Sequence, residues 1–90
     1  MPSITQSLLI DTAQGGLHMA DSVYGVLEDA KYVPAMRTEA TLALAAIDIA
    51  VPIFKAIMDG WCKDPDVLNA AIFSVKQAVV LAEKIKATVP

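Results

Sequence analysis

The residues best suited to chemistry form a polar line in the first third of the chain. Asp11, His18, Asp21 and Glu28 fall at intervals of seven, three and seven residues, which places them on one face of a helix. If two copies met along this line, the carboxylates and the imidazole could supply metal ligands, as in helical-bundle metal sites. Such sites point into a bundle, whereas this line is the polar face of its helix. We therefore predict a solvated stripe without a metal or cofactor, and keep a metal-carboxylate protein as a remote alternative.

The single cysteine is the only candidate nucleophile of its kind. Cys62 precedes Lys63 and a helix start, and both features can lower a thiol pKa. Nucleophilic catalysis also requires a positioned base, and the only histidine, His18, belongs to another helix. We expect an inert loop cysteine, with its reactivity left open. One cysteine excludes an internal disulfide and is typical of a reducing, cytoplasmic location.

The remaining patterns exclude several function classes. Gly15 and Gly16 lack the preceding strand and the following Lys-Ser/Thr of a phosphate loop. No Ser-His-Asp order or zinc-ligand spacing can be assembled. The chain has a net charge of −3, and its seven Lys and Arg residues are scattered, so we expect no nucleic-acid partner. The prediction is a protein that is not an enzyme.

The elements that position these residues are predicted to be three helices over about residues 4–30, 34–59 and 65–88. Apolar residues recur at helical spacing, and no segment alternates as a strand would. Short connections make consecutive helices antiparallel neighbours. We therefore predict an all-α, three-helix up-down-up bundle forming a single domain over residues 1–90, which oligomerises.

Helix ends carry recognisable signals. Ser3 and Gln6 match a capping box, and Pro34 suits the first turn of the second helix. Gly60 suits a left-handed C-terminal cap. The clearest boundary is Asp64-Pro65-Asp66, where Asp64 is expected to cap the third helix.

Two positions leave alternatives open. Gly15-Gly16 either breaks the first helix or permits a close helix crossing, and we favour a continuous helix. Pro52 either kinks the second helix on its polar side or breaks it, which would give four helices.

The chain is unusually apolar for its length: 56% of its residues are hydrophobic and the mean hydropathy is +0.52. The most hydrophobic run, residues 42–58, contains Asp48, Pro52 and Lys55, so we do not expect a membrane span or a membrane partner. The N-terminus has no basic residue before its first apolar stretch, so we expect no secretory signal.

This apolar surplus predicts a protein partner. The second helix is apolar around most of its circumference and two neighbours cannot cover it, while Phe73 and Val80 interrupt the polar face of the third helix. We list Phe73, Val80, Leu44 and Trp61 as interface candidates. For Trp61 we favour a plug at the bundle end, against Ile4 and Leu8, over a role in binding.

The predicted function is a small assembly subunit that self-associates, most simply as a dimer, through the second and third helices. The alternative is an acidic regulator, such as an inhibitor, immunity protein or antitoxin, that occludes a partner through Asp11, Asp21 and Glu28.

Overall fold

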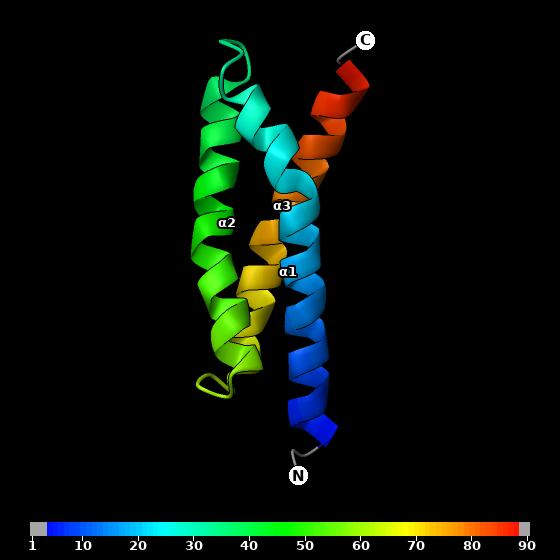
Figure 1. The fold of residues 1–90 in the computed structure, drawn as a ribbon, viewed down its shortest axis with the longest axis vertical. Helices are drawn as coiled ribbons and strands as arrows, with labels where there is room; N and C mark the ends of the chain where they lie inside the picture. Colours follow the sequence, from blue (N-terminus) through cyan, green and yellow to red (C-terminus); the bar gives the residue numbers. More distant parts are fainter. Residues whose placement is uncertain (1–3, 89–90) are drawn as a thin grey trace.

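A computed structural model describes residues 4–88 and contains three helices: α1 (Ile4–Ala30), α2 (Arg37–Met58) and α3 (Pro65–Thr88). Figure 1 shows them running up, down and up in an elongated bundle of 49 × 19 × 17 Å. Each helix packs against the other two. The prediction of an all-α three-helix bundle is confirmed.

Both doubtful positions lie inside continuous helices. α1 runs unbroken through Gly15 and Gly16, and α2 runs through Pro52, so the four-helix alternative is wrong. Pro52 is exposed, on the same side of α2 as Asp48 and Lys55. The helical hydrogen bond that a proline cannot form there lies on the side of α2 that faces water, so the buried side of the helix keeps its packing.

The core is built mainly from alanine and aliphatic residues, with one aromatic ring. Phe54 is fully buried at its centre. The other buried hydrophobic residues include Ala13, Ala20, Val23, Leu27, Ala40, Ile47, Ala50, Ile57, Leu68, Ala71, Val75, Ala78, Ala82 and Ile85. Small side chains allow the helix axes to approach closely, which explains the narrow cross-section.

Gly16 is the point where α1 meets both other helices. It is buried, and a Cβ placed on it would lie 2.5 Å from Cζ of Phe54 and 2.8 Å from Cδ1 of Ile72. No side chain fits at those distances without displacing its neighbours. Gly15 is exposed, with nothing within 4 Å of its Cβ position. Of the two outcomes predicted for this pair, the close crossing is therefore observed, and Gly16 alone makes it.

The α1–α2 connection is longer than the sequence predicts. The expected start of the second helix at Pro34 is wrong, because residues 33–36 form a hydrogen-bonded turn in which the Met36 N–H donates to the carbonyl of Val33. The first helical bond of α2 runs from Ala40 to Met36, which caps the helix without a side-chain hydrogen bond. Pro34 thus serves the turn and not the helix.

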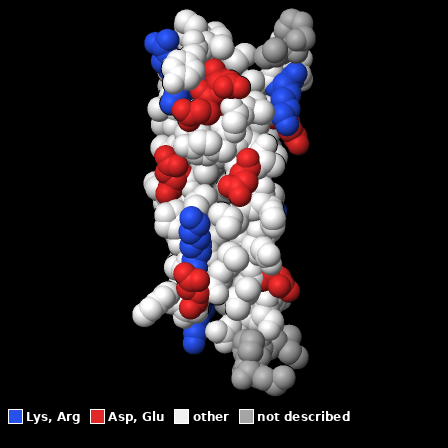
Figure 2. Space-filling model, in the orientation of Figure 1, with Lys and Arg blue, Asp and Glu red and all other residues white. Residues whose placement is uncertain are grey.

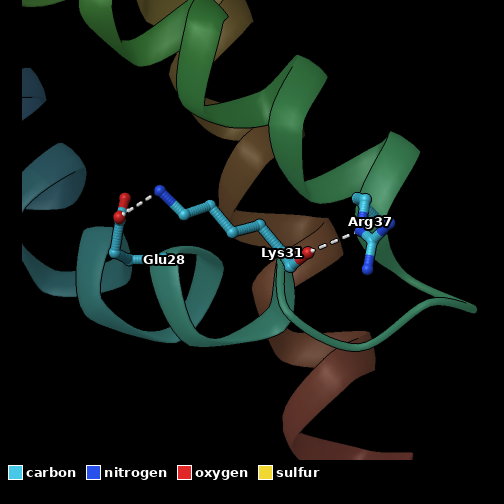
Figure 3. Close-up of polar contacts among 3 residues, drawn as sticks. All are labelled: Glu28, Lys31 and Arg37. Carbon is cyan, nitrogen blue, oxygen red and sulfur yellow. Dashed lines mark hydrogen bonds and ion pairs between the residues drawn. The ribbon is translucent and has the colours of Figure 1, made fainter.

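Lys31 joins the two sides of this connection, as Figure 3 shows. Its ammonium forms an ion pair with Glu28, and its carbonyl accepts a hydrogen bond of 3.2 Å from Nε of Arg37. The ammonium also lies 5.2 Å from the centre of the Tyr32 ring. The hydrogen bond to Glu28 raises the pKa of Lys31 above its usual 10.5.

The α2–α3 connection agrees closely with its predicted signals. Gly60 has φ +83°, and the N–H groups of Gly60 and Trp61 donate to the carbonyls of Ile57 and Ala56, a Schellman arrangement. The Asp66 N–H donates to Oδ1 of Asp64 at 2.9 Å, so the Asp64 cap is confirmed. At the other end of the chain, the predicted capping box depends on Ser3, which lies outside the described residues.

Candidate functional site

The strongest candidate for a functional surface is a group of large apolar side chains exposed on α2 and α3. Leu42 and Ile49 on α2 are 67% and 69% exposed, and Phe73 and Val80 on α3 are 64% and 55% exposed. We call the surface formed by these four residues the outer α2–α3 face. Scattered apolar residues are normal on a protein surface, but a continuous patch marks an interaction site.

On α2 the apolar side chains form a continuous stripe. They follow intervals of four and three residues, which keeps them on one side of a helix: Leu42, Ala46, Ile49, Ile53 and Ala56. The charged and polar residues Thr41, Asp48 and Lys55 are exposed on a different side. The stripe therefore has no charged member over four turns of α2.

A shallow groove of about 200 Å³ connects this stripe to α3. Its walls include Ile49 and Ile53 from α2, and Ala70 and Ser74 from α3. Because the α3 wall consists of small residues, it offers little steric hindrance to an approaching helix. The groove therefore joins the apolar stripe of α2 to Ala70 and Ser74 of α3, and Ile49 is the member of the outer α2–α3 face that lines it.

The same two helices are long and apolar enough to cross a membrane, judged by length and composition. Only 28% of the most apolar window of each is buried within the bundle. Core helices of soluble proteins pass the same test when they are mostly buried, and these two are not.

One of the four predicted interface residues is placed differently from the prediction. Leu44 is only 7% exposed because it lies on the side of α2 that faces the core, one turn from Ile47, so it cannot contact a partner. Phe73 and Val80 are exposed, and their role at an interface stays a prediction.

The expected plug at Trp61 is wrong, since this residue is 88% exposed and Leu8 is 64% exposed. Hydrogen bonding ties Trp61 back to α2, and α1 extends past the α2–α3 connection, so the indole has no bundle end to cover (Figure 1). Trp61 remains available to a partner.

The predicted acidic face lies on α1, where Asp11, His18 and Asp21 are exposed and Glu28 is paired with Lys31. Figure 2 shows acidic side chains spread over this side of the molecule with uncharged surface between them. Within residues 4–88 no group of three or more His, Cys, Asp or Glu residues is placed to hold a metal ion.

The Cys62 thiol is half-buried and packs against the core. His18, the only histidine of the sequence, is exposed on α1, and no hydrogen bond or ion pair between it and Cys62 is found among the described residues.

A further hollow, not anticipated from the sequence, lies between the last turns of α1, the turn before α2 and the last turns of α3. It has a volume of about 430 Å³, and its lining includes Val26, Val33, Met36 and Ile85, with Lys86 also contributing.

Comparison of the chain with protein-family models, with curated proteins and with solved structures gives no match.

Proposed function

We propose that this protein is a small, non-enzymatic assembly subunit of the cytoplasm that self-associates through its outer α2–α3 face. The observation that carries the proposal is the exposure of Leu42, Ile49, Phe73 and Val80, all more than half exposed, together with an apolar groove between α2 and α3 that Ile49 lines. Short chains with an apolar surplus commonly bury it against a second copy.

The size of the exposed surface is compatible with a dimer. Burying a large apolar side chain contributes about 1.5–3 kcal/mol, and these residues are already partly covered. Two copies of the face would then contribute on the order of 10 kcal/mol, comparable with the cost of association. Because the gain and the cost are comparable, we expect a weak, reversible dimer.

An acidic regulator is the second candidate function. It is favoured by the exposure of Asp11 and Asp21 on α1 and by the absence of Lys and Arg from the first 30 residues of the sequence. An acidic surface of this kind suits a basic protein partner. It ranks second because its charges are well separated, whereas the apolar stripe of α2 is not interrupted by any charged residue.

Sedimentation velocity over a wide concentration range tests self-association, combined with flotation on uncharged phospholipid vesicles. We expect a concentration-dependent monomer–dimer equilibrium and no flotation. A monomer at every concentration would overturn the proposal. Flotation with the vesicles would show that lipid covers α2 and α3, and would also overturn it.

A further inference from the structure

Besides the apolar stripe of α2, a second regular line of residues runs along the exposed side of α3, and we call it the seam. Its residues alternate at intervals of four and three, the pattern of a two-helix contact. All of them are exposed: Asp66, Ala70, Phe73, Gln77, Val80 and Lys84. The seam is acidic at its first residue, basic at its last, and uncharged between.

We propose that the second copy packs its α3 antiparallel to this one, with Asp66 opposite Lys84 of the second copy. This inference rests on the proposed self-association and adds its direction and register. In an antiparallel pair, a seam residue that begins a four-residue interval faces one that begins a three-residue interval. With Asp66 opposite Lys84, Ala70 lies opposite Val80 and Phe73 opposite Gln77, and two-fold symmetry repeats each pairing.

Charge selects this direction. Antiparallel packing places an acid against a base at both ends of the contact. Parallel packing would place Asp66 against Asp66 and Lys84 against Lys84, and like charges facing each other in an interface are unfavourable. Asp64 and Lys86, in the end turns of the same helix, add to the same end-to-end difference.

Side-chain size favours the same register. The smallest residue of the seam, Ala70, lies opposite the branched Val80, and the largest, Phe73, lies opposite the flexible Gln77. A parallel pair would set Phe73 against Phe73 and leave a gap between two alanines. Alternating large and small residues across a contact fills space more evenly.

The groove beside α3 extends the contact to α2. An antiparallel partner helix that lies on the seam borders the groove walls at Ala70 and Ser74, and beyond them Ile49. By symmetry α3 borders the same groove of the second copy. The α2 and α3 helices of both copies would then form a four-helix arrangement that covers the exposed apolar residues of both helices.

Disulfide trapping tests the direction and the register together. The variant carries Asp66→Cys and Lys84→Cys, with Cys62→Ser to remove the native thiol. Within one copy the two positions are 18 residues apart on one helix, about 27 Å, so they cannot bond to each other. The controls are the two single variants, Asp66→Cys and Lys84→Cys, each with Cys62→Ser. Circular dichroism checks that all three remain helical, and mild oxidation is followed by non-reducing electrophoresis.

We expect covalent dimers from the double variant and at least tenfold fewer from either single variant. Dimers from a single variant at the level of the double one would place like residues together, and would overturn the antiparallel direction. A protein that sediments as a dimer but is not trapped would overturn the register while leaving self-association intact. A monomer in sedimentation would overturn both proposals.

Discussion

The outer side of α1 and the outer α2–α3 face are both exposed, yet they have opposite character. The exposed line of α1 contains Asp11, Gln14, His18 and Asp21, all polar. The outer α2–α3 face holds four large apolar side chains in a comparable position. α1 is thus an ordinary amphipathic helix, satisfied by one core, whereas α2 and α3 have more apolar surface than a three-helix core can bury.

The contrast separates residues that fold the chain from residues available for association. On α1 most apolar side chains face inward, with Leu8 and Tyr24 exposed, and the closest contact of the helix is made by a residue with no side chain, Gly16. On α2 and α3 the core positions are filled by other residues, such as Ile47 and Val75, so Ile49 and Phe73 are not needed for folding. Substitutions of the folding residues should therefore change the free energy of unfolding, whereas substitutions of the outer α2–α3 face should change association.

The largest effect is expected from removing the apolar character of the outer α2–α3 face. Ile49→Ser with Phe73→Ser should raise the dimer dissociation constant at least about 100-fold, because two central apolar contacts are lost on each copy. Analytical ultracentrifugation measures it. Leu8→Ser with Tyr24→Ser, exposed apolar residues of α1, is the matched control and should leave association unchanged. An equal loss from the control would remove the distinction between the two faces.

The next effect concerns folding and comes from the two adjacent glycines. Gly16→Ala should lower the free energy of unfolding by about 1–3 kcal/mol, because its Cβ overlaps the buried Phe54 ring. Gly15→Ala should raise it by about 0.5–1 kcal/mol, because alanine is the better helix former and the position is open. Urea unfolding compares them. Two changes of the same sign would contradict the close crossing.

A smaller effect is expected at Lys31. Its pKa is raised in the folded protein by the hydrogen bond to Glu28, so its contribution to stability is present below pH 10.5 and is lost as pH rises through the folded value. Lys31→Gln should lower the melting temperature slightly at pH 8, and the difference from the unchanged protein should disappear once the pH exceeds the raised pKa of Lys31 in the folded protein. A difference that persists at the higher pH would show that the ion pair is not its cause.

The smallest effect on association is expected from reversing the acidic face. Asp11→Lys, Asp21→Lys and Glu28→Lys together should change the dimer dissociation constant by less than about threefold, because isolated exposed charges contribute little. Sedimentation at low and at moderate salt measures this. A large, salt-sensitive change would move the interface to α1 and favour the acidic-regulator function.

Much of the fold could be predicted from local signals. Asp64-Pro65-Asp66 and Gly60 are recognisable because such residues satisfy backbone groups that lack hydrogen bonds at a helix end. These signals act within a few residues. The start of α2 was missed because Pro34 suits a first turn and a tight turn equally well, and bonding between Val33 and Met36 decides between them.

The candidate surface was predicted only in part. Phe73 and Val80 interrupt a polar line, which is visible in the sequence. Leu42 and Leu44 both belong to an almost wholly apolar helix. They are two residues apart, which places Leu44 toward the core and Leu42 toward solvent. Periodicity alone could not orient α2, because its apolar residues leave no clear buried side. The position of Trp61 depended on how far α1 extends past the connection, which no local pattern contains.

The connection between α2 and α3 also bears on the order in which the chain folds. Its two ends are held by short-range bonds, the Schellman pair before it and the Asp64 cap after it. Closing so short a loop costs little chain entropy, so this hairpin can form before contacts distant in sequence exist. α1 would then dock last, on the Phe54 ring that receives Gly16. A newly made hairpin would meanwhile expose its inner and outer apolar sides together, which makes the interval before α1 docks the time of greatest risk of aggregation.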